Sequence, residues 1–176
     1  MTVKLKDKEF VPFISAESID QRLKVLGTQI SKDFKNDNPI LLGVLNGSFM
    51  FLSDLAKYIE IPSEFTFVKL SSYSGENSTG QVKSLIGLDT DLKGRRVIIV
   101  EDIVDSGLSM NHLLENLQVK DPLDISIVSL LFKPEALKFP VKIDYIGFEI
   151  PNKFVVGYGL DYDGLGRNLP SIYQLK

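Results

Sequence analysis

Short, almost wholly apolar runs alternate with helical patterns along the 176 residues of this chain. Ile40 to Leu45 and Arg95 to Val100 are the clearest runs, and each has the length of one strand. A strand that is apolar on both sides is buried on both faces, which is typical of parallel sheets. Strands that alternate with helices favour right-handed βαβ units. The sequence therefore predicts an α/β fold, with a parallel central sheet flanked by helices.

The remaining elements follow the same alternation. Ser15 can cap a helix that carries apolar residues on one face from Ile19 to Phe34. Pro151 to Lys176 is rich in Gly, Asp and Tyr and indicates loops with short strands. No linker or repeat interrupts residues 1–176, so we expect a single domain. Further strands are expected at 64–70, 125–132 and 143–150, and further helices at 49–58 and 110–117.

The composition excludes several classes of function. A hydrophobic fraction of 44% and a charged fraction of 24% are typical of a soluble globular protein. The net charge of −3 gives no reason to expect binding to nucleic acid or to an anionic membrane. There is no cysteine, and His112 is the only histidine, so disulfides, thiolate catalysis and multi-histidine metal centres are excluded. The N-terminus has no apolar signal core, which favours a cytoplasmic location.

One segment, Val97 to Ser109, carries the most chemical information: VIIVEDIVDSGLS. An apolar strand ends in two acids, and Asp105-Ser106-Gly107-Leu108-Ser109 then leads into a helix. Ligands of open α/β sheets bind beyond the carboxyl ends of the strands. Backbone N–H groups at a helix N-terminus can hold a phosphate, and Glu101 and Asp102 could bind ribose hydroxyls or hydrated Mg²⁺. A sugar phosphate would satisfy both halves of this segment.

The acidic segments of the sequence allow three other interpretations. Asp-Ser-Gly after two apolar residues also resembles an aspartic protease motif, but those enzymes are all-β and need a second copy of it. The acids could instead be a solvated turn between strand and helix. Calcium loops are suggested by 89–91 and 161–164, but Val100 and Ile172 stand where the bidentate glutamate should be. Calcium binding is therefore rejected.

The segment resembles the phosphoribosyl pyrophosphate motif of the type I phosphoribosyltransferases. Three further segments narrow the resemblance to the hypoxanthine-guanine branch of that family, and together they extend it over about 40–167. They are Gly43 to Ser48, Ser129 to Lys133, and Gly147 to Tyr162. The resemblance implies the type I phosphoribosyltransferase fold, with a small hood formed by the N-terminal and C-terminal segments.

The resemblance also assigns roles around the sugar. The loop from Asp105 to Ser109 would surround the 5′-phosphate, and Glu101 and Asp102 would face the ribose and a Mg²⁺ ion. Asp105 would lie near purine N7 and act as the general base or proton partner. A carboxylate can take the imidazole proton as N9 attacks C1, and its charge suits a transition state with oxocarbenium character.

The resemblance places five further residues near the base and the leaving group. Lys133 would meet the 6-oxo group of the purine, which gives a partner to a cation at the end of an apolar strand. Phe154 would stack on the base, and the backbone of Val155 would contact the edge near C2. Asp161 resembles the ligand of a second Mg²⁺, and Arg167 resembles a contact to pyrophosphate.

Two loops complete the expected site. The backbone of Asn46 and Gly47 would approach the pyrophosphate, often through an unusual cis peptide in relatives. Ser72-Tyr73, in the polar stretch from Ser71 to Gly80, would close over the reacting centre and exclude water.

The chain departs from the family pattern at three places. Many relatives have lysine at Asn46, which would leave contact with the leaving group to backbone and metal. Leu108 replaces a lysine of some members. Gly164-Leu165-Gly166 is smaller than the bulky residues usual before the arginine.

The implied activity is purine salvage with Mg²⁺. Hypoxanthine or guanine would react with phosphoribosyl pyrophosphate, giving nucleoside monophosphate and pyrophosphate. The residues leave open which purine is preferred, and a related specificity for xanthine is the nearest alternative. A regulator that keeps the fold without turnover is another class, and retention of Asp105, Lys133 and Asp161 speaks against it. Partners would be these small molecules and further copies of the chain, as a dimer or tetramer, with no nucleic acid or membrane.

Overall fold

The computed structural model describes residues 2–71 and 84–176, which form two sheets and three α-helices within these ranges. The larger sheet has the strand order β5-β4-β3-β6-β7-β8. All neighbouring pairs in it are parallel except β5 with β4. Its strands are β3 (Ile40–Leu45), β4 (Glu64–Ser71), β5 (Ser84–Ile86), β6 (Arg96–Val104), β7 (Asp124–Phe132) and β8 (Tyr145–Glu149). The predicted parallel sheet is confirmed, while its antiparallel edge strand β5 was not predicted.

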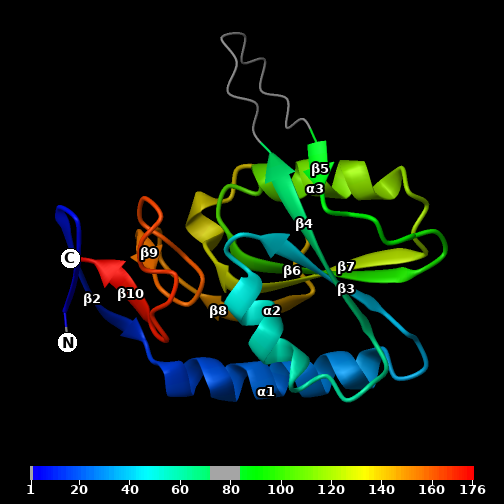
Figure 1. Cartoon of the computed structure of the whole chain (residues 1–176), viewed down its shortest axis with the longest axis horizontal. Helices are drawn as coiled ribbons and strands as arrows, with labels where there is room; N and C mark the ends of the chain where they lie inside the picture. The colour runs from blue at the N-terminus through cyan, green and yellow to red at the C-terminus, as the bar shows by residue number, and fades with distance from the viewer. Residues whose placement is uncertain (1, 72–83) are drawn as a thin grey trace, which may run out of the picture.

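Helices cover both faces of this sheet (Figure 1). Helices α1 (Ala16–Asp33) and α2 (Phe49–Ala56) pack on one face, where Leu41 and Val100 join their apolar side chains in one cluster. Helix α3 (Leu108–Gln118) packs on the other face against Leu42 and Ile99. The predicted flanking helices are confirmed, although α2 ends two residues before the expected Tyr58 and α3 begins two residues before Met110.

Helix α1 begins where the sequence predicts. Ser15 is its N-cap, and the Ser15 hydroxyl accepts the backbone N–H of Ser18 at 3.1 Å. Ile19, Leu23 and Ile30 are buried along one face of the helix, as their spacing indicates. No helix in the described ranges is long and apolar enough to cross a membrane.

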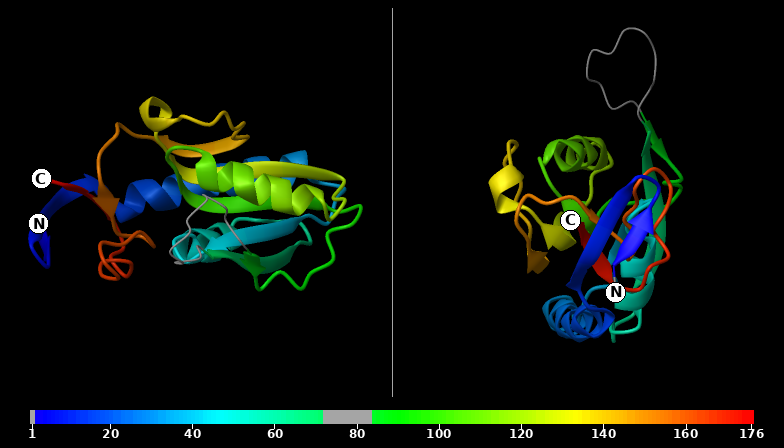
Figure 2. Two further views of the ribbon diagram at one scale, coloured as in Figure 1. Left: turned by 90° about the horizontal axis from the view of Figure 1, so that it is seen from above. Right: turned by 90° about the vertical axis from the view of Figure 1, so that its left-hand side faces the viewer.

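The hood is the smaller sheet, with the order β1-β2-β10-β9. Its strands are β1 (Val3–Leu5), β2 (Lys8–Ile14), β9 (Val155–Val156) and β10 (Ile172–Leu175). The N-terminal hairpin thus pairs with the C-terminal strand, and both chain ends lie on the hood (Figure 2). The predicted hood from the two terminal segments is confirmed. Its residues Val155, Tyr158 and Ile172 belong to the same apolar cluster as α1 and α2.

The strand order fixes the place of a binding site. From β3, the chain continues to β4 on one side of the sheet, while β6 pairs with β3 on the other side. Between β3 and β6 the order therefore reverses, and ligands of open α/β sheets bind at such a point, beyond the carboxyl ends of the strands. The ends of these two strands are Leu45 and Val104.

Candidate active site

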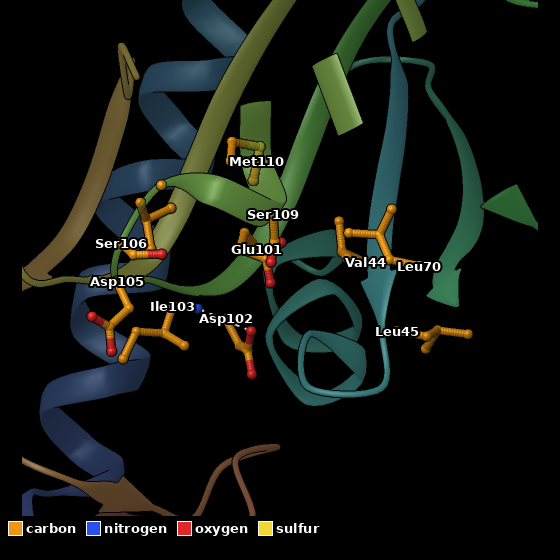
Figure 3. Close-up of a pocket in the computed structure, with 12 residues that line it drawn as sticks. Val44, Leu45, Leu70, Glu101, Asp102, Ile103, Asp105, Ser106, Ser109 and Met110 are labelled. Carbon is orange, nitrogen blue, oxygen red and sulfur yellow. Dashed lines mark hydrogen bonds between the residues drawn. The ribbon is translucent and has the colours of Figure 1, made fainter. Parts of the chain in front are cut away.

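A cleft of about 260 Å³ lies where the order of strands reverses. Its lining comes from the end of β3, the last residues of β6, and the turn into α3. In Figure 3 the carboxylates of Asp102 and Asp105 project beyond the end of β6, while Glu101 lies beside Ser109. The lining residues are Val44, Leu45, Leu70, Glu101, Asp102, Ile103, Val104, Asp105, Ser106, Gly107, Ser109 and Met110. The structure thus brings together most of the predicted sugar-phosphate residues.

The turn between β6 and α3 has room for a phosphate. Gly107 is the N-cap of α3, with φ of +82°, and it offers no side chain to the first-turn N–H groups. A Cβ at this position would overlap the carbonyl oxygen of Phe139. The carbonyl of Ser106 accepts the N–H groups of Lys138 and Phe139, each at 3.0 Å. The turn is therefore held rigidly, and its free N–H groups and the helix dipole suit an anion.

Leu108 departs from this arrangement. It is the first residue of α3, its side chain is 41% exposed, and it does not line the cleft. The predicted contact of Leu108 with substrate is thus left to its backbone N–H, which is 3.4 Å from the Ser106 hydroxyl oxygen.

Two adjacent carboxylates lie at the base of the cleft. Burial raises the pKa of Glu101 well above its ordinary value, and the neighbouring charge of Asp102 raises it further. Burial likewise raises the pKa of Asp102, although its hydrogen bond from the N–H of Ile103 at 3.0 Å opposes that shift. Asp102 is nearly buried and Glu101 half-buried, and two neighbouring carboxylates with disfavoured charges form a suitable donor set for a hard divalent cation, which would relieve their repulsion. Glu101 and Asp102 therefore fit a Mg²⁺ ion.

Asp161 is not part of that pair. Its carboxylate accepts Arg167 at 2.6 Å and the N–H of Gly164 at 2.7 Å. Within the described ranges, no three acidic or histidine side chains gather into one metal site. The three predicted metal ligands thus form one pair and one separate carboxylate.

Lys133 does not line the cleft, but it contacts Asp105, which does. Lys133 follows β7, is only 6% exposed, and its Nζ lies 2.9 Å from Asp105 Oδ2. The Lys133 N–H donates to the Val104 carbonyl at 3.0 Å, which ties the residue to the neighbouring strand. The predicted base and the predicted 6-oxo contact are therefore in contact with each other. A purine at this pair would replace their mutual contact, and it would then meet a proton acceptor and a cation at once.

The turn after β3 lies against both walls of the site. The peptide bond between Leu45 and Asn46 is cis. A Cβ on Gly47 would overlap the Asp102 carboxylate, and a Cβ on Gly159 would overlap the Gly47 carbonyl oxygen. Gly47 therefore lies closely packed between β6 and the C-terminal loop. The hydroxyl of Ser48 is buried and has no hydrogen-bond partner among the described residues.

The hood supplies the aromatic ring predicted for the base. Phe154 is 46% exposed, with its ring centroid 6.2 Å from that of Phe10 and 6.0 Å from that of Tyr162. Val155 beside it is buried and belongs to β9. An exposed ring supported by two others provides a stacking surface at the edge of the hood.

Arg167 reaches the site despite the small residues before it. Its guanidinium donates to the Gly159 carbonyl at 2.6 Å and pairs with Asp161. Gly164 and Gly166 have φ of +83° and +97°, a backbone that glycine adopts without cost. The substitution of glycines for bulky residues therefore makes a tight turn that leaves the arginine at Asp161.

Two predicted residues cannot be placed. Ser72 and Tyr73 lie outside the described residues. Sequence reasoning, for its part, missed the apolar residues that line the cleft: Val44, Leu45, Leu70, Ile103, Val104 and Met110. Leu70 lies in β4, one residue beyond the partner of Leu45. The strand order would therefore have placed it beside the end of β3.

An open α/β sheet with a phosphate turn and an acidic pair at the reversal of strand order defines an α/β protein whose ligand site suits a sugar phosphate. Comparison with known proteins makes this class specific. Residues 15–163 match the family model described as phosphoribosyl transferase domain. The chain is 43% identical to the hypoxanthine-guanine phosphoribosyltransferase of Bacillus subtilis, over 93% of this chain and 91% of that protein. It is 44% identical to the Lactococcus lactis enzyme of the same name, over 93% and 89%.

Solved structures agree. The hypoxanthine phosphoribosyltransferase of Trypanosoma cruzi, solved as a ternary complex with substrates, superposes with a TM-score of 0.89 at 36% identity over 98% of this chain and 97% of that one. The hypoxanthine-guanine phosphoribosyltransferase of Bacillus anthracis gives 0.86 at 37%, over 94% and 96%. The chain belongs to the phosphoribosyltransferase family, in its hypoxanthine-guanine branch.

Proposed function

We propose that the chain is a purine salvage enzyme that transfers the 5-phosphoribosyl group of phosphoribosyl pyrophosphate to hypoxanthine, guanine or both. The products are IMP or GMP and pyrophosphate. The observation that carries this proposal is the cleft that brings together a phosphate turn, the neighbouring acids Glu101 and Asp102, and Asp105, whose carboxylate pairs with Lys133. The shared name of the similar bacterial enzymes supports the same substrates.

The sugar phosphate binds along the end of β6. The N–H groups from Ser106 to Ser109 hold the 5′-phosphate, and Glu101 and Asp102 face the ribose hydroxyls with Mg²⁺. When bound, Mg²⁺ would neutralise part of the charge on pyrophosphate and improve it as a leaving group. Cation chemistry of this kind is required because the sugar substrate carries about four negative charges beside a cleft of carboxylates.

The purine binds between the cleft and the hood. Lys133 donates to its 6-oxo group, Phe154 stacks on its ring, and the Val155 backbone contacts its C2 edge. Asp105 accepts the imidazole proton as the bond from N9 to C1 forms and the bond from C1 to pyrophosphate oxygen breaks. Its negative charge stabilises the positive charge that develops on the sugar.

The leaving group is held from two sides. The backbone of Asn46 and Gly47 contacts the pyrophosphate from one wall, and Arg167 contacts it from the other. In this proposal Asp161, now paired with Arg167, would hold a second Mg²⁺ and so help to neutralise the leaving group. Ser72-Tyr73 closes over the reactants and keeps water from the activated sugar.

A pyrophosphate-release assay tests the proposal. We expect turnover with phosphoribosyl pyrophosphate and hypoxanthine or guanine, loss of turnover in excess EDTA, and recovery when Mg²⁺ is added. Steady-state kinetics with each oxopurine then give the preference, and turnover with xanthine alone would move the protein to the neighbouring specificity. Binding of a purine nucleotide without any turnover would make the chain a regulator. Full activity in metal-free buffer would overturn the roles of Glu101, Asp102 and Asp161.

We also propose a cytoplasmic location and a homo-oligomer, either dimer or tetramer. The family supports the second proposal, and light scattering after gel filtration tests it. The expected mass is two or four times that of the chain, and a monomer at micromolar concentration would contradict it.

A further inference from the structure

A buried tyrosine joins the C-terminal loop to the helix behind the turn that contains Gly47. Tyr158 is 4% exposed, and its hydroxyl donates to Asp54 Oδ2 at 2.6 Å. Burial, and next this hydrogen bond, raise the pKa of Tyr158 far above its ordinary value, so the hydroxyl remains a donor. Hydrogen bonds to an ionised acceptor are stronger than neutral ones. The bond links two segments that are 104 positions apart in sequence.

On one side of the hydrogen bond, Asp54 is connected to the turn after β3 through helix α2. Asp54 lies in α2, whose first residue directly follows Ser48. Its second oxygen accepts Lys57 Nζ at 2.6 Å in an exposed ion pair, which contributes little, so the buried bond from Tyr158 is the contact that holds the carboxylate. A helix of this length transmits position as a rigid element, because its backbone hydrogen bonds allow little internal change. A contact that fixes Asp54 therefore also fixes Asn46 and Gly47, which lie in the turn that leads into the helix.

On the other side of the hydrogen bond, Tyr158 belongs to the loop that carries Arg167. The next residue, Gly159, has φ of +99°, packs directly on the Gly47 carbonyl, and accepts Arg167 at 2.6 Å through its own carbonyl. Tyr158 itself has φ of +50°, a backbone that a residue with a Cβ adopts at a cost. Such a conformation persists only where the surroundings impose it, and it often marks a functional segment.

We propose that Tyr158 and Asp54 are positioning residues for the pyrophosphate half of the site. This inference rests on the proposed function. Their hydrogen bond sets the separation between the Asn46–Gly47 turn and the loop that carries Arg167. Among the described residues, neither side chain hydrogen-bonds to Asp105, Lys133 or Phe154, which the proposed function places at the purine. Loss of the bond should therefore weaken recognition of the pyrophosphate group while recognition of the purine stays the same.

Tyr158→Phe tests the inference, because it keeps the ring and removes only the donor. We expect the KM for phosphoribosyl pyrophosphate to rise about tenfold, in line with the loss of one hydrogen bond to a charged group. The KM for pyrophosphate in the reverse reaction should rise by a similar factor. The KM for the purine should stay within a factor of about two.

Tyr145→Phe is the matched control. Tyr145 is 8% exposed and donates to Asp33 Oδ2 at 2.8 Å, in the same apolar cluster but between β8 and α1. Both variants should lower Tm by similar amounts. Only Tyr158→Phe should change the KM for phosphoribosyl pyrophosphate, because only that bond joins the two walls.

A second pair of variants tests the acceptor. Asp54→Ala should reproduce the effect of Tyr158→Phe, and the double variant should be no worse than either single one. Asp54→Asn keeps an acceptor oxygen and should restore most of the affinity. Lys57→Met controls for the ion pair that Asp54→Ala also removes, and it should leave every KM unchanged.

The outcomes separate this inference from the proposed function. If Tyr158→Phe lowers Tm like Tyr145→Phe and leaves the KM for phosphoribosyl pyrophosphate unchanged, the bond is only structural and the inference is wrong. An equal rise in the KM for purine would also overturn it. If the parent protein turns over no oxopurine, the proposed function fails. Calorimetry of the parent and of Tyr158→Phe with phosphoribosyl pyrophosphate and Mg²⁺ would then test the inference. Equal affinities would reject it.

Discussion

The contact between Asp105 and Lys133, at 2.9 Å, joins the two side chains with the most direct chemistry in the cleft. In Asp105→Asn the amide can still accept a hydrogen bond, but it cannot take a full proton and it carries no charge. We expect kcat to fall by about 10²–10⁴-fold, which is the usual contribution of a general base. The affinity for phosphoribosyl pyrophosphate should change much less. Steady-state kinetics and calorimetry measure the two effects.

Normal turnover of Asp105→Asn would limit the segment to phosphate binding and make the catalytic assignment wrong. A weaker binding of phosphoribosyl pyrophosphate that accounts for the whole loss would lead to the same conclusion. The protease interpretation finds no support in the placement of this residue, since its carboxylate lies beside Lys133 and the turn that suits a phosphate.

Lys133→Met keeps the aliphatic stem and removes the cation. Because Lys133 is nearly buried, no water can easily replace it at the 6-oxo group. We expect kcat/KM with hypoxanthine to fall by the equivalent of about 1.5–3 kcal/mol. Adenine, which has an amino group at this position, should be rejected less strongly than by the parent. The exposed Lys138 offers the control variant Lys138→Met, and equal kinetics for both variants would place Lys133 outside the base site.

At the scale of single elements, the sequence predicted every strand of the larger sheet except its edge strand β5. Each of the predicted strands is an apolar run, which is a local signal. It missed the true end of β6, which continues through Glu101 and Asp102 to Val104. Two acids at the end of a strand break the apolar pattern, yet the ladder with β7 still continues through Val104. The hairpin of β1 and β2 was also missed, since its pairing with β10 joins the two ends of the chain.

The site shows the same division between local and non-local information. The residues of one motif, from Glu101 to Ser109, were predicted together and line one cleft, apart from the side chain of Leu108. The contact of Tyr158 with Asp54 was not predicted: Tyr158 lies in the segment Gly147 to Tyr162 that carries the resemblance, but no sequence pattern relates it to Asp54. Only packing of the C-terminal loop on α2 brings them within 2.6 Å.

The turn between β3 and α2 gives a prediction at this scale. Gly47→Ala would place a methyl group on the Asp102 carboxylate, so either the turn or the carboxylate must move. We expect at least tenfold weaker Mg²⁺-dependent turnover with little loss of stability, since small displacements of a catalytic group cost large factors in rate. Kinetics at several Mg²⁺ concentrations and a thermal melt measure both. An alanine variant with parental kinetics would show that Gly47 does not set the place of Asp102.

On the scale of the whole molecule, hood and sheet are joined through one apolar cluster that contains two similar hydrogen bonds. Tyr145 donates to Asp33 of α1, and Tyr158 donates to Asp54 of α2. Both tyrosines are buried within that cluster, and each ties a different part of the chain to a helix. Unfolding must expose both tyrosines, so the stability of the whole molecule depends on their protonation.

These tyrosines predict how stability changes at alkaline pH. Burial, and next the bond to an aspartate, raise the pKa of each well above the ordinary 10.0. Above about pH 10 the unfolded chain loses both protons while the folded protein keeps them, so the unfolding free energy falls as pH rises. Each tyrosine contributes a slope of about 1.4 kcal/mol per pH unit, and below pH 10 its contribution is complete.

The double variant Tyr145→Phe/Tyr158→Phe isolates this effect, because every other titratable side chain is the same in both proteins. At pH 8 it should be less stable than the parent, by about 1–3 kcal/mol for each lost bond to a charged group. Between pH 10 and about 11.5 its unfolding free energy should fall less steeply, so the two curves converge. Urea denaturation followed by circular dichroism measures both curves, since the chain has no tryptophan. Parallel curves over this range would mean that the tyrosines ionise equally in the folded and unfolded states.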